Sequence, residues 1–219
     1  MLQGSGKVKD KLTKNKNFEL SQYTYDLHKK IAYNYIIARK LLDVGCGTCV
    51  DSYILREKYG LGVYSTDIYK HENVNLFNLD FKEGSILKLP YENNSFDYVF
   101  LHDVLHHIDE EKQSYDLHLL ALTELKRVCK EGGTIIIVEG NRYNPLFYPH
   151  MVKMLGHNHW KQSYFKRVIN EVFNNVEFKY FEAHSYPKKL LWLGKIYEFI
   201  MEKVSPKVFL AYNVAIINV

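Results

Sequence analysis

Two glycines follow a short apolar run in the segment LDVGCGTC (42–49), where Gly45 and Gly47 allow the backbone to turn tightly and to approach a ligand closely. The apolar run predicts a strand, and residues 50–59 predict a helix that ends at the next glycine. A strand, a tight turn and a helix in this order can bind a nucleotide cofactor at the turn. The dinucleotide fingerprint G-x-G-x-x-G would need a glycine where this chain has Val50, which disfavours a cofactor that contains pyrophosphate.

A carboxylate ends the next predicted strand: Asp67 closes the segment LGVYSTD (61–67), 22 residues after Gly45. The segment is rich in β-branched and aromatic residues, which favour a strand. A carboxylate in this position can accept hydrogen bonds from both hydroxyls of a ribose. An isolated aspartate at a strand end is more often a turn residue or a helix cap. Together with the glycine turn, however, Asp67 indicates a ligand that contains adenosine.

Three histidines in the segment HDVLHHI (102–108) follow the clearest buried strand of the sequence, SFDYVFL (95–101). Histidine titrates near neutral pH, so we predict that His107 is a general base, although such histidines commonly cap or pack against a following helix. A metal site made of His102, His106 and two later histidines would lack an acidic ligand in an evident position. The sequence therefore predicts no metal site.

Strands and helices alternate around these groups, which predicts a doubly wound α/β sheet with right-handed crossovers. The segment TIIIVEG (134–140) has no polar alternation, as a parallel strand that is buried on both faces requires. The remaining predicted elements are helices at 25–37, 117–128, 164–173 and 190–204, and strands at 78–83, 176–181 and 208–219.

The chain has 219 residues, of which 47% are apolar, and this is enough for one globular domain. Residues 1–17 hold few apolar side chains and are predicted to form a disordered basic tail, which leaves 18–219 as a single domain. The composition changes near 142–160, a segment rich in aromatic residues and histidine and broken by two prolines. We predict that this segment and 186–204 are helical cap insertions.

The charge and cysteine content exclude several classes of protein. A net charge of +4 is below that of most dedicated nucleic-acid-binding domains. Three cysteines are too few and too scattered for a disulfide scaffold or a second zinc-binding pair. No apolar run reaches about 18 residues, and the N-terminus lacks the apolar core of a secretory signal. These features predict a cytoplasmic protein in a reducing environment.

Four segments carry a resemblance to a known family: LLDVGCGTC (41–49), YSTD (64–67), EGSILKLPYENNSFDYVFLHDVLHHI (83–108) and LKRVCKEGGTIIIVEGN (125–141). Their order and spacing resemble the motifs of class I S-adenosylmethionine-dependent methyltransferases, the methyltransferase type 11 branch in particular, over roughly residues 30–141. The resemblance implies an enzyme with a seven-stranded, Rossmann-like, mostly parallel sheet whose last strand is antiparallel. It also implies that S-adenosylmethionine lies across the carboxyl ends of the first four strands.

Within this resemblance, the glycine turn would lie against the methionine part of the cofactor, with Asp43 near its ammonium group. Asp67 would hold the ribose diol, residues 84–86 would contact adenine, and the main chain at 101–102 would face the amino acid moiety. The residues implied in cofactor binding are Asp43, Gly45, Cys46, Gly47, Asp67, Ile68, Ser85, Ile86, Leu101 and His102.

Two positions depart from the family pattern. The family usually has a third glycine where this chain has Cys49, and an Asp or Asn that contacts adenine where this chain has Ser85. Cysteine is small and serine still forms hydrogen bonds, so we expect weaker or adjusted cofactor binding and not its loss. A non-catalytic protein of the same fold remains an alternative, as does a nucleic-acid methyltransferase. A nicotinamide-dependent reductase is disfavoured by Val50.

The methyl acceptor is predicted from the two cap segments. Aromatic residues between 142 and 160, and the segment KKLLWLGKIYEFIMEKV (188–204), suggest a small-molecule acceptor that is apolar or linked to a lipid or glycan. We predict that both segments line the acceptor pocket. The second segment has an amphipathic pattern that would also suit a membrane surface, which would make the protein peripheral to the membrane, although such helices more often pack on their own core.

Overall fold

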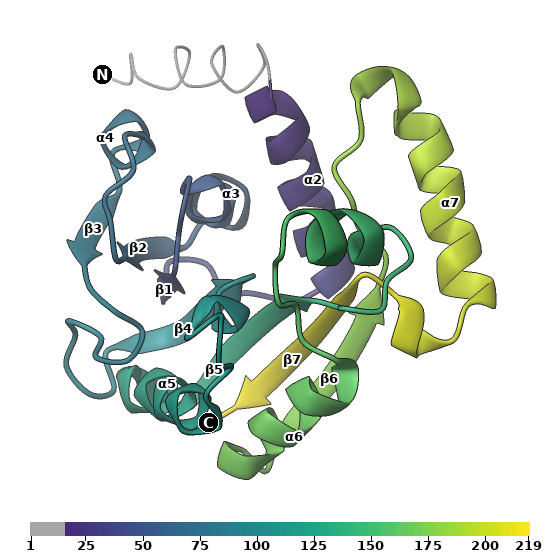
Figure 1. Ribbon diagram of the computed structural model, residues 1–219. Coiled ribbons are helices and arrows are strands. Elements are labelled where there is room, and N and C mark those ends of the chain that lie inside the picture. The colour runs from purple at the N-terminus through teal and green to yellow at the C-terminus, as the bar shows by residue number, and fades with distance from the viewer. Residues whose placement is uncertain (1–15) are drawn as a thin grey trace.

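The computed structural model describes residues 16–219, with side chains from Gln22 onward, and its described part contains one seven-stranded sheet (Figure 1). The strand order is β3-β2-β1-β4-β5-β7-β6, and β7 runs antiparallel to both of its neighbours. The strands are β1 (Lys40–Val44), β2 (Gly62–Asp67), β3 (Asp80–Glu83), β4 (Phe96–His102), β5 (Cys129–Gly140), β6 (Val176–Phe181) and β7 (Tyr212–Asn218). The predicted doubly wound α/β fold is therefore confirmed.

Helices cover both faces of the sheet (Figure 1). They are α2 (Lys16–Ile31), α3 (Val50–Tyr59), α4 (Asn73–Phe77), α5 (Tyr115–Val128), α6 (Gln162–Val172) and α7 (Leu191–Val204), with short 3-10 turns at Leu105–His107, Lys188–Leu190 and Lys207–Phe209. Alternate residues of β5 enter different cores: Ile135 and Ile137 pack with α5 and α6, whereas Ile136 and Val138 pack with α2 and α3. Burial on both faces explains the unbroken apolar run of this strand.

The first helix ends earlier than the sequence predicts. The pattern predicted a helix over 25–37, but α2 stops at Ile31, and Ala32 adopts a left-handed conformation with φ of 51°. Tyr35 then packs edge-on against Tyr98, with ring centroids 5.3 Å apart. The apolar spacing after Ile31 therefore reflects an aromatic cluster and not a helical face.

The paired glycines at 132–133 precede the predicted strand over 134–140, but in the structure they lie inside β5, which begins at Cys129. Gly132 has φ of +71°, and a Cβ on Gly133 would lie 2.8 Å from the carbonyl oxygen of Lys130. The pairing with β4 shifts in register at this point, which is typical of a β-bulge. The predicted strand therefore starts five residues too late.

Most of the predicted N-terminal tail (1–17) lies outside the described residues, and its last two positions are the first residues of α2. Of the predicted caps, 142–160 contains a π-helical segment at Tyr148–Met154, and 186–204 contains α7. Across 16–219, no helix has both the length and the apolar character needed to cross a membrane.

Candidate active site

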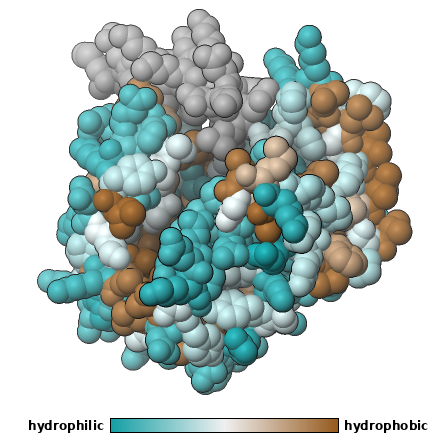
Figure 2. Space-filling model, viewed as in Figure 1, coloured by the Kyte–Doolittle hydropathy of each residue, from teal (hydrophilic) through white to brown (hydrophobic). Residues whose placement is uncertain are grey.

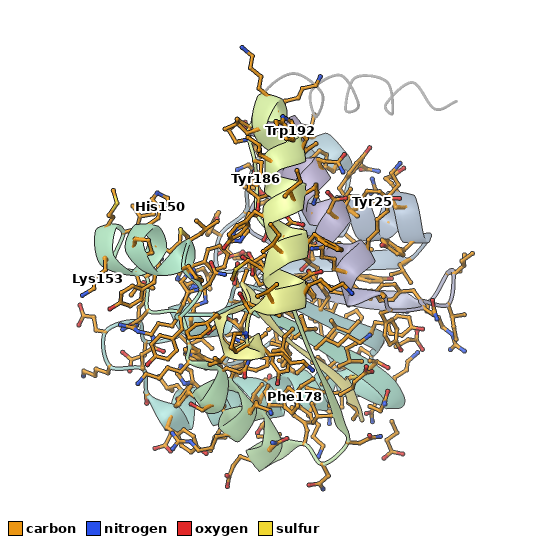
Figure 3. The ribbon with its side chains drawn as sticks, turned by 90° about the vertical axis from the view of Figure 1, so that its right-hand side faces the viewer. Tyr25, His150, Lys153, Phe178, Tyr186 and Trp192 are labelled. Carbon is orange, nitrogen blue, oxygen red and sulfur yellow. The ribbon has the colours of Figure 1, made fainter. Side chains whose placement is uncertain are left out.

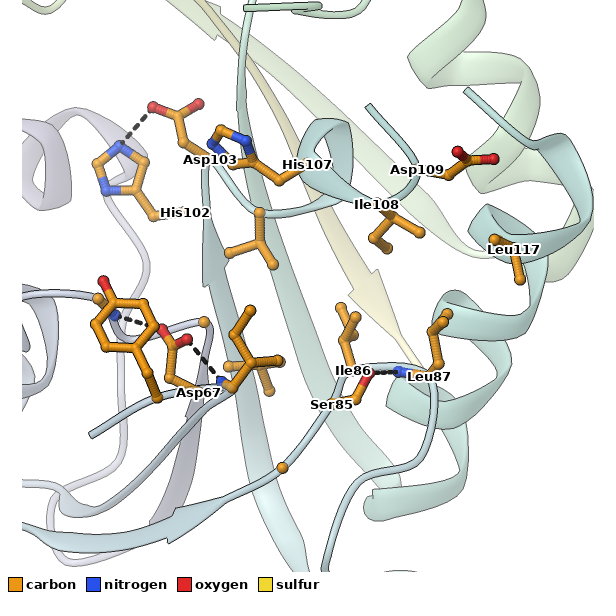
Figure 4. Close-up of a pocket in the computed structure, with 17 residues that line it drawn as sticks. Asp67, Ser85, Ile86, Leu87, His102, Asp103, His107, Ile108, Asp109 and Leu117 are labelled. Carbon is orange, nitrogen blue, oxygen red and sulfur yellow. Dashed lines mark hydrogen bonds and ion pairs between the residues drawn. The ribbon is translucent and has the colours of Figure 1, made fainter. Parts of the chain in front are cut away.

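A cavity of about 590 Å³ opens at the carboxyl ends of β1, β2 and β4, where the strand order reverses between β1 and β4 (Figure 4). This is where doubly wound sheets bind ligands, and the volume suits a small molecule. The lining residues are Val44, Gly45, Gly47, Asp67, Ile68, Tyr69, Gly84, Ser85, Ile86, Leu87, His102, Asp103, Val104, His107, Ile108, Asp109 and Leu117.

The glycine turn is packed so tightly that a side chain at Gly45 would not fit. Its φ is +70°, and a Cβ there would lie 2.5 Å from a methyl carbon of Val104. The backbone N–H of Gly45 donates to the carbonyl oxygen of Thr66, at 2.8 Å, which ties the turn to β2. Cys49, where the family has its third glycine, is buried and left-handed with φ of 61°. The departure in sequence therefore leaves the glycine-like backbone conformation in place.

Asp67 lines the cavity and is fixed there by two backbone donors. The N–H of Gly47 donates to its Oδ2 at 2.8 Å, and the N–H of Ile68 donates to its Oδ1 at 2.7 Å (Figure 4). Each carboxylate oxygen can accept a further hydrogen bond. The carboxylate is therefore pre-oriented to accept two more hydrogen bonds from a ligand such as a ribose diol.

Ser85 and Ile86 form the opposite wall, after β3. The Ser85 hydroxyl accepts a hydrogen bond from the N–H of Leu87, at 3.2 Å, so it stabilises its own loop (Figure 4). Gly84 lies against Pro90, because a Cβ on this glycine would lie 2.5 Å from the proline ring. The backbone N–H of Gly84 donates to the carbonyl oxygen of Asp67, at 2.9 Å, which holds the loop close to Asp67.

Three residues implied in cofactor binding do not line the cavity: Asp43, Cys46 and Leu101. Asp43 is 2% exposed and accepts a hydrogen bond from the Ser52 hydroxyl. Burial, together with the nearby charge of Asp51, raises the pKa of Asp43 to about 7. Asp43 therefore supports the turn from beneath it, and its contact with a cofactor's ammonium group stays a prediction.

His102 carries a positive charge at neutral pH. Burial alone would lower the pKa of His102. The negative charges of Asp51, Asp103 and Glu139 outweigh burial and raise this pKa to about 9. The Oδ2 atom of Asp51 lies 3.0 Å from Nδ1 of His102. The other carboxylate oxygen of Asp51 lies 2.8 Å from Nε2 of His28 in α2. Burial alone would raise the pKa of Asp51, but the two histidines hold it well below its usual range.

Sequence reasoning missed two tyrosines that reach this site from distant elements. The hydroxyl of Tyr23, in α2, lies 3.2 Å from Nε2 of His102 and forms a short hydrogen bond with the hydroxyl of Tyr212, in β7. The Tyr212 hydroxyl is also 3.3 Å from Oδ2 of Asp103. Burial is the largest cause, and the charge of Asp103 the second, that raises the pKa of each tyrosine well above the ordinary value for tyrosine. Both tyrosines therefore stay protonated. The sequence carries no local signal for them.

The predicted base His107 lines the cavity from the 3-10 turn Leu105–His107. Its side chain is about half exposed, and its Nδ1 lies 3.2 Å from Oε1 of Glu110. Burial, followed by the charge of His106, lowers the pKa of His107. His107 is therefore neutral at physiological pH and able to accept a proton.

Comparison with known proteins agrees with this geometry. Residues 42–137 match the family model described as a methyltransferase domain. Relatives include an uncharacterized methyltransferase of Schizosaccharomyces pombe (32% identical, covering 50% of this chain and 43% of that protein) and a demethylmenaquinone methyltransferase of Oceanobacillus iheyensis (28% identical, covering 66% and 71%). A solved S-adenosylmethionine-dependent methyltransferase from Archaeoglobus fulgidus has the same fold, with a TM-score of 0.62, 17% identity and coverage of 90% and 92%.

A methyltransferase domain model therefore matches residues 42–137, and the fold is that of solved S-adenosylmethionine-dependent methyltransferases. The matched segment includes the glycine turn, Asp67, and the loop at 84–86. The chain spans less than half the length of the S. pombe relative.

Proposed function

We propose that this protein transfers the methyl group of S-adenosylmethionine to a small-molecule acceptor. The observation that carries the proposal is the cavity at the strand ends, in which Asp67 and the glycine turn face the loop at 84–86. The sulfonium methyl group is already activated, so the enzyme has to align donor and acceptor and exclude water. Such alignment can contribute about 7–11 kcal/mol to the lowering of the barrier.

The charges of the residues that line the cavity support one orientation of the cofactor. Asp67 would accept the ribose hydroxyls, and the protonated His102 would lie beside the methionine carboxylate, because that is the cation at the glycine-turn end of the cavity. In the transfer, a bond forms between the acceptor atom and the methyl carbon as the carbon–sulfur bond breaks. His107, which is neutral, would take the proton that an alcohol or phenol releases.

The aromatic residues named in the two predicted caps do not line the cofactor cavity. Tyr143, Tyr148 and Trp160 line a separate cavity of about 480 Å³, and Trp192 is 63% exposed. The prediction that both segments line the acceptor pocket therefore stays a prediction. The cofactor cavity has apolar walls of its own, however, which are formed by Ile108 and by apolar residues such as Ile86 and Leu117. Together with the demethylmenaquinone methyltransferase relatives, these walls support a small acceptor with an apolar part.

The cofactor assignment predicts a selective thermal shift. S-adenosylmethionine or S-adenosylhomocysteine should raise the melting temperature, whereas NADH should not, because the turn lacks the third glycine of a pyrophosphate site. A ligand at 100 times its dissociation constant adds about 2.7 kcal/mol to the free energy of unfolding. Differential scanning fluorimetry measures both. No shift with either sulfur compound at millimolar concentration would contradict the assignment. A shift without methyl transfer to any cell-extract fraction would favour the non-catalytic alternative.

A membrane contact is also proposed, through the outer face of α7. Glu198 is 2% exposed and forms ion pairs with Lys30 and Lys195, at 2.8 and 3.1 Å, so the polar side of α7 faces the protein. The outward side is apolar, as the brown right-hand edge of Figure 2 and the position of Trp192 in Figure 3 illustrate. The exposed apolar residues of α7 are Trp192, Leu193, Ile196, Phe199, Ile200 and Val204.

Exposed lysines near the ends of α7 suit an anionic lipid surface: Lys189, Lys203 and Lys207. We expect the protein to sediment with phosphatidylserine vesicles more than with phosphatidylcholine vesicles. The double variant Trp192→Ser/Phe199→Ser should lose most of this binding without losing stability, since both side chains are exposed. Equal sedimentation of the variant and the native chain would rule out this face as the lipid contact.

A further inference from the structure

Three side chains next to the cofactor cavity could share one ion. Asp103 follows β4, His106 lies in the 3-10 turn Leu105–His107, and His159 follows the π-helical segment. Each offers one ligand atom, and these atoms lie within 4.8 Å of one another. From this cluster and the partners around it, we infer that Asp103, His106 and His159 bind a divalent transition-metal ion.

His159 is the observation that calls for a ligand. Its side chain is 4% exposed, and neither Nδ1 nor Nε2 has a hydrogen-bond partner among the described residues. A buried polar group without a partner is costly, so it requires an explanation. The ring lies directly over Gly140, where a Cβ would come within 2.2 Å of Nδ1. A metal ion bound by one ring nitrogen would give this imidazole the partner that it lacks.

His106 is already oriented as a metal ligand. Its Nδ1 lies 2.7 Å from Oε2 of Glu139, whose side chain is fully buried. The other oxygen of Glu139 accepts hydrogen bonds from the backbone N–H groups of Val104 and Leu105, at 3.0 and 2.6 Å. A carboxylate that receives one imidazole N–H fixes the tautomer and leaves the opposite nitrogen free to coordinate a metal. Here that nitrogen is Nε2.

Asp103 supplies the acidic ligand that the sequence did not reveal. Its φ is 56°, and its Oδ1 accepts a hydrogen bond from the N–H of Gly140, at 2.7 Å. This conformation and contact hold the carboxylate beside the two histidines. Two imidazoles and one carboxylate form a donor set that suits zinc, iron or cobalt and leaves coordination positions open.

The location gives the ion a function. Asp103 lines the cofactor cavity, whereas His159 lines the second cavity together with Trp160 and Arg142. An ion between them would have its open positions available to an oxygen or nitrogen of the methyl acceptor. This role rests on the proposed methyl transfer, but the binding of the ion does not.

A second histidine cluster is a weaker candidate for a metal site than the first. His106, His107 and His157 also have ligand atoms within 4.8 Å of one another. The latter two, however, both face Oε1 of Glu110, at 3.2 and 3.4 Å, and are partly exposed. Their imidazoles therefore already have a partner, unlike His159.

Zinc binding to untagged, chelator-treated protein tests the inference without any cofactor. Isothermal titration with Zn²⁺ should show one ion per chain, and Co²⁺ should give the visible absorption of a bound ion. His159→Leu and Asp103→Asn should weaken binding by more than tenfold. His157→Ala should bind as the native chain does, and so should His150→Ala, whose residue lies on the outer π-helical segment (Figure 3).

The melting temperature distinguishes a variant that has lost a metal ligand from one that has lost its fold. Because the His159 nitrogens have no hydrogen-bond partners among the described residues, His159→Leu should melt at least as high as the native chain, while Zn²⁺ should raise only the native melting temperature. Absence of stoichiometric zinc at micromolar concentration overturns the inference. Loss of binding in His157→Ala but not in His159→Leu would do so as well. A failure of methyl transfer would leave the zinc result unaffected.

Discussion

Replacing Asp67 by alanine is expected to weaken the binding of S-adenosylhomocysteine by at least about 100-fold. The carboxylate lines the cavity and is held in place by the N–H groups of Gly47 and Ile68, so a ligand does not have to orient it. Two charge-assisted hydrogen bonds to a ribose diol are worth about 1.5–3 kcal/mol each, and the loss of both gives the stated factor. Isothermal titration calorimetry measures the dissociation constant.

The control is Asp80→Ala, because Asp80 is an exposed aspartate at the start of the neighbouring strand β3 and lies outside the cavity lining. It should bind the ligand as tightly as the native chain. Asp67→Asn should fall between the two, since the amide keeps one acceptor oxygen for the glycine turn. If Asp67→Ala binds normally, the ribose is held elsewhere, and the orientation of the cofactor proposed above is wrong.

Replacing His102 by glutamine is expected to remove a stabilisation of about 3 kcal/mol that depends on pH. Its pKa rises from an ordinary value of 6.5 to about 9 because Asp51 outweighs the effect of burial. A shift of that size corresponds to about 3 kcal/mol of preference for the charged form in the folded protein. Asp51 remains ionised throughout, since its own pKa is held low.

The sign of the pH effect follows from the raised pKa. The folded state binds the proton more tightly than the unfolded state, so the stabilisation is complete below pH 6.5 and disappears as the pH rises through about 9. Urea unfolding between pH 6 and 10 should show the difference between the native chain and His102→Gln shrinking by about 3 kcal/mol. The exposed His150→Gln should show no such trend. A constant difference across this range would mean that His102 does not bear the charge.

The cofactor side of the site was predictable because it depends on short-range sequence features. The glycine turn, the carboxylate of Asp67 and the loop at 84–86 each follow a predicted strand, and the ends of parallel strands meet at one edge of a sheet. Tight turns and buried strands leave local marks in the sequence. Asp43 shows the limit of this reasoning, because its place in the motif does not reveal that Ser52 holds it beneath the turn.

Helix α7 shows why an amphipathic pattern alone does not determine packing. The pattern correctly predicts a helix, yet it does not state which face turns inward. In the structure, Glu198 forms an ion pair with Lys30, a residue 168 positions away in the sequence. This part-buried ion pair turns the polar face of α7 toward the protein. A buried charge must be paired, so the partner decides the orientation.

The sequence by itself determined the sheet, the class of cofactor and the residues of the glycine turn and the 84–86 loop that line the cavity, because periodicity and turn chemistry act over a few residues. Tertiary structure alone decided the network of Tyr23, Asp51 and His102 and the cluster in which His159 meets Asp103. These side chains come from separate elements, so only the pairing of strands and the docking of helices bring them within hydrogen-bonding or coordination distance. Their charges and pKa values depend on that proximity and on burial, and neither is encoded in the local sequence.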